Sequence, residues 1–373
     1  MNRRTFLREA GMTAAGLACC SPVLGKPSGG VPQVRKSKNW AWIGSDAEAS
    51  DDYWKARFEK LKEARFDAVL PEVYNGRASH FRSDRFGTRA GWLERLIPIA
   101  RSFGLEIHAW MWTVPCLLED VLRKHPDWYM VNRLGESSAD QPAYVDYYRF
   151  LCPSREEVRE FIRETVREIS RFDVDGVHLD YVRYPDVILA KGLWPKYNVI
   201  QDREYPRFDY CYCGTCRTKF REQHGIDPMD IEEPSVNREW LQFRYDQVTG
   251  LVNNWLIPAG RQHGKIMSAA VFPNWRHVRQ EWRAWNLDAV LPMLYNRYYL
   301  EGAAWIADQC REGIRSLQHS TQLYSGLMLD RPETLKEYAM KSFEGGAAGI
   351  SIFSLRRLTD EHLTKLAEVI KNH

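Results

Sequence analysis

The sequence predicts an α/β fold, a (β/α)8 TIM barrel with a cysteine-containing insertion after the fourth strand. Its 373 residues, 44% hydrophobic and 27% charged, can bury one large core, and α/β barrels fill such a length as a single domain. Short apolar runs alternate with amphipathic stretches of helical period, which is the pattern of parallel strands joined by crossover helices. Eight such units follow one another, the number that closes a barrel.

The first half of the barrel follows this alternation in order. We expect strand 39–45 and helix 51–65, strand 66–74 with loop 75–90 and helix 91–103, then strand 105–115 with a long loop and helix 154–172, and fourth strand 174–182. Helix 154–172 is expected to begin with a capping box, because Ser154 stands three residues before Glu157.

The second half repeats the pattern. The remaining strands are expected at 265–273, 287–295, 322–329 and 347–353, each preceded by a helix, and the last helix at 359–370. Asp330 is expected to cap the helix that begins at Arg331 and Pro332.

Two long connections interrupt the alternation. Residues 186–237, after the fourth strand, are dense in Pro, Tyr, Asp and Cys and lose periodicity, so they form an inserted excursion. Residues 116–153 form a second long loop, after the third strand. Because both follow strands, both are expected at the C-terminal face of the barrel, where barrel active sites are built.

The N-terminus resembles a twin-arginine export signal. Arg3 and Arg4 precede an apolar stretch at 10–20, and a Pro/Gly-rich break follows at 21–32. We therefore expect residues 1–35 to be a signal and linker, 36–373 to be the barrel, and the mature protein to be periplasmic or extracellular. An ordinary amphipathic helix is the alternative. Lipid attachment at Cys19 or Cys20 is a further option, although the residues before each fit a lipobox poorly.

The charge of the chain argues against two classes of partner. A formal net charge of +3, with Lys and Arg mixed evenly among Asp and Glu, gives no basic field for nucleic acid or a membrane surface. No transmembrane domain is expected after signal removal, and the oligomeric state stays open. The 14 Trp, 18 Tyr and 15 Phe are suited to stacking on sugar rings, and equally to filling a core.

The segment most informative about chemistry is the fourth strand. It alternates buried Val and Leu with His178 and Asp180, so two polar side chains point into the barrel near its C-terminal end. A buried carboxylate is costly unless it is hydrogen-bonded or used, which favours a catalytic or substrate-binding role for Asp180. The alternative is that Asp180 only holds Arg183 or a neighbouring loop.

Eight stretches of the chain resemble one known family. They are, in order, VLPEVYNGRASHFRS, GLEIHAW, HPDWYMVNRLGE, SREEVREFI, DVDGVHLDYVRYP, NREWLQFRYDQV, QEWRAWNLDAVLPMLY and GAAGISIFSL. Together they resemble the glycosyl hydrolase-like family 10 proteins, a barrel family of exported and lipid-anchored bacterial proteins. The resemblance implies glycosidic-bond hydrolysis of a bacterial cell-surface or plant-type polysaccharide, and it places Asp180 on the family's principal acidic position.

The chain departs from this family pattern at two positions. Tyr181 stands where many members have a second acid, and Glu72 stands where an uncharged polar residue is usual. Glycoside hydrolysis generally uses two carboxyl groups, about 5 Å apart for retention or about 6.5 to 9.5 Å for inversion. We assign Asp180 as nucleophile or base and Glu72 as acid, because apolar neighbours would raise the pKa of Glu72.

Alternatives to this pair remain open. Glu72 could instead form an ion pair with Arg77 or Arg82. Asp46, Asp186 and Asp330 are reserve carboxyl groups, with Asp330 more suited to capping.

Residues near strand ends are candidates for sugar contact. They are Trp42, His108, Trp110, Trp112, His178, Arg183, Tyr184, Trp275, Tyr295 and Asn296. Trp40 and Trp42 share one face of their strand, as do Trp110 and Trp112, because strand side chains alternate. If that face is the interior they are stacking platforms, and if it is the helix layer they are core. An inward histidine is often only a satisfied buried group.

The cysteines suggest a metal site. Cys211, Cys213 and Cys216 lie within six residues, a spacing suited to one tetrahedral ion, with Cys152, Cys116 or His224 as fourth ligand. The segment resembles the zinc-cluster segment of certain barrel β-galactosidases in Arg217, Lys219, Phe220 and Gly225. Structural zinc bound by Cys152, Cys211, Cys213 and Cys216 in a zinc knuckle is favoured, with disulfides as the alternative. Cys310 is expected to be plain core.

The leading hypothesis is therefore a glycoside hydrolase without an organic cofactor. The chain has neither GxGxxG nor a P-loop at a strand-to-helix turn. One rival is a carbohydrate-binding barrel with reduced catalysis, which a missing second carboxyl near Asp180 would favour. Another is a metal-dependent hydrolase or deacetylase that uses His108, His178 and Asp180.

Overall fold

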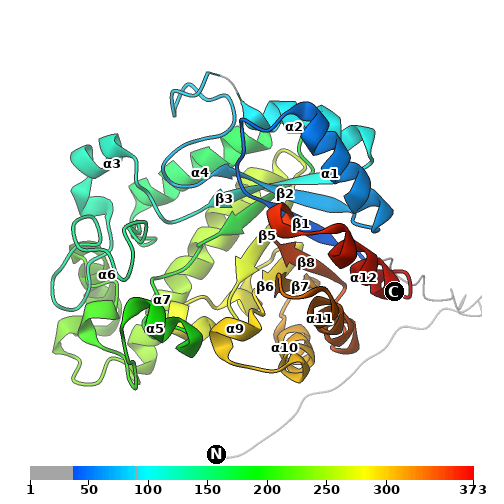
Figure 1. Ribbon diagram of the computed structural model, residues 1–373. Coiled ribbons are helices and arrows are strands. Elements are labelled where there is room, and N and C mark those ends of the chain that lie inside the picture. The colour runs from blue at the N-terminus through cyan, green and yellow to red at the C-terminus, as the bar shows by residue number, and fades with distance from the viewer. Residues whose placement is uncertain (1–36, 90) are drawn as a thin grey trace, which may run out of the picture. The chain divides into compact units, whose positions relative to one another are not determined.

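The computed structural model describes residues 37–89 and 91–373, and within them eight parallel strands close a barrel in chain order (Figure 1). The strands are β1 Trp40–Ile43, β2 Ala68–Tyr74, β3 Glu106–Trp112, β4 Gly176–Asp180, β5 Ile266–Val271, β6 Ala289–Pro292, β7 Gln322–Met328 and β8 Gly349–Phe353. Each pairs with the next, and β8 pairs with β1. The expected (β/α)8 barrel is confirmed. The export signal expected at 1–35 lies outside the described residues.

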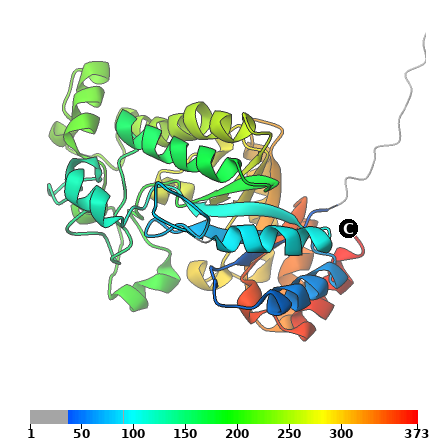
Figure 2. The ribbon, with the colours of Figure 1, turned by 90° about the horizontal axis from the view of Figure 1, so that it is seen from above.

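Helices cover the outside of the strands, and further short helices gather at one end of the barrel (Figures 1 and 2). The outer helices are α1 Asp51–Glu63, α2 Trp92–Ser102, α4 Glu156–Ser170, α7 Arg238–Gly250, α8 Ile257–Arg261, α10 Ala303–Ser316, α11 Pro332–Glu344 and α12 Asp360–Ile370. A π-helical segment, Leu251–Leu256, joins α7 to α8. Among the described residues, no helix is both long and apolar enough to cross a membrane.

The helices at that end belong to the connections that follow strands. They are α3 Glu119–Lys124 after β3, α5 Trp194–Tyr197 and α6 Gly214–His224 after β4, and α9 Asn296–Tyr299 after β6. The cyan and green segments that carry α3, α5 and α6 extend together in both views. The two long connections predicted from the sequence thus lie at the C-terminal ends of the strands.

Three local expectations are wrong. No α-helix precedes β6, because β5 and β6 are joined by the 3-10 turns Trp275–Val278 and Trp282–Ala284. Helix α4 begins at Glu156 without a capping box, since Ser154 is buried and its hydroxyl instead accepts a hydrogen bond from the Cys216 thiol at 3.1 Å. Asp330 does not cap α11, which begins at Pro332, because its carboxylate accepts from the Arg331 amide and pairs with Arg297.

The inner faces of the strands form a core of their own. Trp40, Trp42, Leu70, Trp110, Leu291 and Tyr324 come from five different strands and pack into one buried cluster. Side chains from strands around a closed barrel can meet in this way only in its interior. Trp40, Trp42 and Trp110 therefore face the interior and not the helix layer.

Barrel closure depends on a close backbone approach at Gly349, where β8 begins beside the segment that leads into β1. The amide of Lys38 donates to the carbonyl of Ala348 at 3.1 Å. A Cβ atom added to Gly349 would lie 1.7 Å from the carbonyl oxygen of Lys38, which is backbone and cannot rotate away. A side chain here would force the first and last strands apart.

We expect Gly349→Ala to lower the free energy of unfolding by about 3 kcal/mol, because overpacking against backbone must displace a strand. Gly44→Ala is the matched control, since a Cβ at exposed Gly44 meets nothing within 4 Å. Urea denaturation of the two variants and the native chain measures the difference. Equal stability of the two variants would contradict this account of closure.

Candidate active site

Asp180 is the last residue of β4 and is 7% exposed. Its Oδ1 accepts a hydrogen bond from the amide of Tyr181 at 2.7 Å, and its Oδ2 accepts one from Nε1 of Trp110 at 3.1 Å. Burial raises the pKa of Asp180 to about 6, although the Tyr181 amide, the Arg183 charge and the Trp110 indole all oppose that rise. The carboxyl group can therefore hold a proton under mildly acidic conditions.

Glu72 is the second carboxyl group at this end of the barrel. It lies on β2, where its Oε1 accepts from Nε1 of Trp112 at 3.0 Å and its Oε2 accepts from Oγ of Ser45 at 3.2 Å. Burial raises its pKa, and the two hydrogen bonds oppose that rise. The ion pair with Arg77 or Arg82 is not found among the described residues, and Arg82 lies instead 3.9 Å from Glu94.

Strand β3 lies between β2, which carries Glu72, and β4, which carries Asp180, and its side chains donate hydrogen bonds to both carboxylates. In the strand register Trp110 is level with Glu72, and Trp112 is level with Asp180. The hydrogen bonds cross this register, because Trp110 donates to Asp180 and Trp112 donates to Glu72. Two neighbouring indoles on one strand face therefore fix both acids, and the negative charge of Glu72 is among the effects that raise the pKa of Asp180.

The two carboxyl groups line one cavity of about 320 Å³. Its wall comprises Trp42, Glu72, Trp110, Trp112, Tyr147, Tyr148, Asp180, Tyr181, Arg183, Asp186, Leu193, Lys196, Tyr197, Phe272, Met293, Tyr295, Tyr298, Tyr299, Met328 and Phe353. Most of these side chains are aromatic. A cavity of this size with aromatic walls and a few convergent polar groups is typical of a small-molecule site.

Arg183 does not depend on Asp180 for its counter-ion. Its Nη1 lies 3.0 Å from Oδ2 of Asp186, and its Nη2 donates to the hydroxyl of Tyr148 at 3.0 Å. The Tyr148 hydroxyl in turn donates to Asp186 at 2.9 Å. This buried triad neutralises the arginine and the reserve acid Asp186, so Asp180 is not needed to hold Arg183.

The structure brings together seven of the predicted site residues. Asp180, Glu72, Trp42, Trp110, Trp112, Arg183 and Tyr295 all line the cavity. Five others, His108, His178, Tyr184, Trp275 and Asn296, do not belong to its wall.

The two histidines lie too deep to reach the cavity. His108 stacks on Trp40 with ring centroids 4.1 Å apart, and His178 shares a hydrogen bond of 2.8 Å with Ser268. Both are fully buried, and burial lowers the pKa of His178. They form the interior layer beneath Trp42, so His108, His178 and Asp180 do not form a joint metal site within the described residues.

The other three point elsewhere. Tyr184 is 1% exposed, and burial followed by the Cys216 and Cys152 thiols raises its pKa, so its ring faces the cysteines and not the cavity. Trp275 packs against Arg276 and the ring of Tyr245 outside the barrel mouth. Asn296 uses its side-chain amide to hold the carbonyls of Glu301 and Gly302 at 3.1 and 2.9 Å.

Sequence analysis missed the aromatic residues that the connecting loops supply. Tyr147 and Tyr148 come from the loop after β3, Tyr197 from α5, and Tyr298 and Tyr299 from α9. The available signal was the density of tyrosine in segments that follow strands, since such segments meet at the C-terminal face of a barrel.

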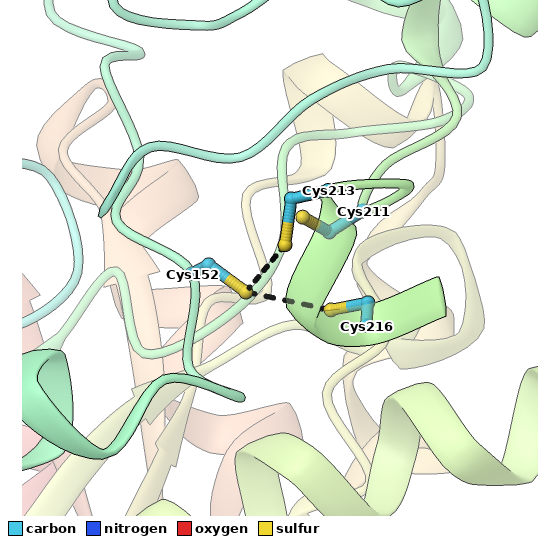
Figure 3. Close-up of side chains that lie close together, drawn as sticks. All are labelled: Cys152, Cys211, Cys213 and Cys216. Carbon is cyan, nitrogen blue, oxygen red and sulfur yellow. Dashed lines mark hydrogen bonds between the residues drawn. The ribbon is translucent and has the colours of Figure 1, made fainter. Parts of the chain in front are cut away.

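Four cysteines converge beside this site (Figure 3). The Sγ atoms of Cys152, Cys211, Cys213 and Cys216 all lie within 4.8 Å of one another, and all four side chains are buried. Cys152 lies 3.4 Å from Cys216 and 3.6 Å from Cys213 between sulfur atoms. Cys116 lies outside the cluster, and His224 stacks on Phe220, so Cys152 supplies the fourth sulfur.

This geometry fits a tetrahedral metal ion better than disulfides. With metal–sulfur bonds of about 2.3 Å, the sulfur atoms of a tetrahedral site lie roughly 3.8 Å apart. A disulfide needs about 2.05 Å, and the four cysteines are free thiols here. Cys213 is also the N-cap residue of α6, and hydrogen bonds from the other three thiols lower its pKa. The residues present therefore suit a metal that binds thiolates.

The sequence profile of the family described as Glycosyl hydrolase-like 10 matches residues 50–328. The chain belongs to this family. Comparison with curated protein sequences gives no match for this family member.

Solved glycosidase structures share the barrel. The β-amylase catalytic domain from Paenibacillus polymyxa is similar with a TM-score of 0.62 and 11% identity, over 91% of this chain and 98% of that one. The β-galactosidase from Rahnella sp. R3 is similar with a TM-score of 0.63 and 14% identity, over 91% of this chain and 56% of that one. The β-galactosidase from Marinomonas ef1 gives 0.61 and 12%, over 90% and 59%. These likenesses show the fold.

The burial of Asp180 predicts a pH-dependent gain in stability for Asp180→Asn. Because the folded-state pKa is raised to about 6 from an ordinary 3.8, the ionised carboxylate destabilises the folded chain increasingly as pH rises from 4 through 6. A displacement of this size corresponds to at most about 3 kcal/mol. We expect the variant to match the native chain near pH 4 and to exceed it by ~1–3 kcal/mol at pH 7 in urea denaturation.

Asp146→Asn provides the control, because Asp146 is exposed in the loop that carries Tyr147. Its stability should follow that of the native chain at both pH values. A stability difference for Asp180→Asn that stays constant between pH 4 and pH 7 would show that Asp180 is not a destabilising buried charge.

Proposed function

We propose that this family member is a glycoside hydrolase that cleaves a glycosidic bond at the C-terminal face of the barrel, with Asp180 and Glu72 as its two carboxyl groups. One observation carries the proposal. Two carboxyl groups with raised pKa values, each held by an indole of β3, line the same aromatic cavity. Two-carboxylate hydrolysis requires such a pair, and a binding barrel with reduced catalysis does not.

The pKa shifts favour catalytic roles for Asp180 and Glu72 that are the reverse of those assigned from the sequence. A pKa of about 6 suits Asp180 to hold the proton that a general acid gives to the glycosidic oxygen. Glu72 accepts hydrogen bonds from the Ser45 hydroxyl and the Trp112 indole, which favour its ionised form, and it then acts as the carboxylate that attacks the sugar or activates water. We propose these roles in place of Asp180 as nucleophile or base.

The cavity wall supports a carbohydrate substrate. The partly exposed rings of Trp112, Tyr147 and Tyr298 in the cavity wall offer surfaces on which sugar rings stack. The family resemblance points to a bacterial cell-surface or plant-type polysaccharide. Export through the segment at 1–35 would bring the enzyme to such a substrate, and we propose a periplasmic or extracellular location on that ground.

We further propose that Cys152, Cys211, Cys213 and Cys216 bind one structural zinc ion. Four buried sulfurs leave no open coordination position, so the metal would hold the chain together and would not take part in hydrolysis. The cluster joins the loop after β3 to the insertion after β4, so a metal there would crosslink two segments that are far apart in the sequence.

Activity of the mature chain is best tested by release of reducing ends from a panel of bacterial cell-wall glycans and plant polysaccharides. We expect Asp180→Asn and Glu72→Gln each to lower kcat at least 100-fold, because general acid–base groups contribute about 10² to 10⁴. Asp146→Asn should retain native activity, because its carboxyl group is exposed and does not line the cavity.

Circular dichroism establishes that the variants remain folded. Loss of activity in both cavity variants and not in Asp146→Asn assigns the pair. A native chain that binds one glycan of the panel and releases no reducing ends would overturn hydrolysis in favour of a binding barrel.

Metal content tests the zinc site separately. We expect the purified chain, kept reduced, to carry about one zinc per molecule by elemental analysis, since four sulfurs complete one tetrahedral site. Cys216→Ser should carry much less, whereas Cys310→Ser, a buried cysteine of α10, should carry as much as the native chain. Equal zinc content in both variants would contradict the proposal that the four cysteines bind zinc.

A further inference from the structure

The four-cysteine cluster joins the two segments that wall the cavity. Cys152 ends the loop after β3, and the other three cysteines belong to the insertion after β4 (Figure 3). The same loop supplies Tyr147 and Tyr148 to the cavity, and the same insertion supplies Lys196 and Tyr197 from α5. Whatever holds the four sulfurs together therefore adds a further tie between these segments, beside the hydrogen bond that the Tyr144 hydroxyl donates to the Asp186 carbonyl at 2.8 Å.

Tyr184 connects the cluster to the strand end that carries Asp180. Its ring is buried, the thiols of Cys216, Cys152 and Cys211 are among its electrostatic neighbours, and its hydroxyl has no hydrogen-bond partner among the described residues. Its carbonyl accepts from Nη1 of Arg183 at 2.8 Å, and Nη2 of Arg183 donates to the hydroxyl of Tyr148 in the loop after β3. A buried unpaired hydroxyl is costly, and thiolates bound to a metal would give it a negatively charged environment to face.

Other contacts keep the insertion folded without the cluster. Arg244 pairs with Asp209, and Arg279 lies 2.5 Å from Glu204 and 3.6 Å from Asp209, all of them buried or nearly so. Tyr212 also donates its amide to the carbonyl of Val131 in the loop after β3 at 2.7 Å. None of the four cysteines lies on a barrel strand. Loss of a metal would therefore loosen the cavity walls and leave the barrel closed.

We propose that metal binding at the four-cysteine site sets the shape of the substrate cavity, by fixing the wall at 144–148 and the wall at 191–197 through Cys152 and Tyr184. This inference rests on the proposed metal site and not on hydrolysis. Tyr184 is thereby a positioning residue whose hydroxyl faces the metal-bound sulfurs. The substrate-binding state of the chain is its metal-loaded state.

Hydrogen exchange tests the coupling without a substrate. The full chain is compared after loading with Zn²⁺ and after stripping with a chelator, both under reducing conditions. We expect amides of 144–148 and 187–201 to exchange at least 10-fold faster in the stripped chain, while β6, β7 and β8 exchange at the same rate in both. Unchanged walls would overturn the proposal, as would acceleration throughout the strands, which would make the metal a requirement for the whole fold.

Two pairs of variants test the route. Titration with Co²⁺, followed by its thiolate charge-transfer absorption, should show no tetrahedral site in Cys216→Ser and a native one in Cys310→Ser. Tyr184→Phe should weaken metal binding about 10-fold, as loss of a group facing metal ligands typically does. Tyr74→Phe is its control, because Tyr74 is equally buried, with Cys116 outside the cluster as its neighbour.

The exchange pattern of the tyrosine pair completes the test. Zinc-loaded Tyr184→Phe should show faster exchange at 144–148 than zinc-loaded Tyr74→Phe. Native affinity and native exchange in Tyr184→Phe would overturn its positioning role. Because none of these measurements uses glycan cleavage, a failure here is distinguishable from a failure of the hydrolase proposal.

Discussion

The geometry of this protein depends on one constraint, the alternation of side chains along strands that close a barrel. Each strand turns one face to the interior and the other to the helices. On β3 the inward positions bring Trp110 and Trp112 between Glu72 of β2 and Asp180 of β4. A slip of β3 by one residue would turn both indoles toward the helices and leave both carboxylates without these donors.

Asp180 and Asp209 are both buried, and their neighbours determine in which direction the pKa of each shifts. Burial acts to raise the pKa of both. Around Asp209, Arg244 and Arg279 overcome the effect of burial, and its pKa falls below the ordinary value. Around Asp180 the donors are an indole and an amide, which are weaker than a facing guanidinium, and its pKa rises to about 6. The first arrangement stabilises a fold, and the second keeps a proton available.

The sequence alone could predict features that depend on the periodicity of apolar residues, but not the depth of a side chain within the barrel. Alternation identified eight strands and the inward face of Asp180, and the family resemblance agreed with the fold. Alternation put Trp40 with Trp42 and Trp110 with Trp112 on shared faces, but whether those faces were the interior became clear only from the structure. The sequence pattern could not show how deep in the barrel each inward side chain lies. His108 and His178 also point inward, but they contact Trp40 and Ser268 and do not line the cavity. The direction in which the Tyr184 side chain points could not be predicted from the sequence either. Strand β4 ends at Asp180 and not at Val182, and Tyr181 adopts a left-handed φ of 50°, so the alternation cannot be carried past it.

The four-cysteine cluster brings together parts of the chain that are far apart in the sequence. Cys152 and Cys213 are 61 residues apart, and the segment between them contains all of α4 and β4. Bringing two such points together in an open chain costs roughly 4 kcal/mol of loop-closure entropy. Docking of α4 and β4 onto the barrel already closes this loop, so the sulfur atoms lie close together without a further loss of chain entropy. The proposed metal would therefore bind a chain in which α4 and β4 are already in place.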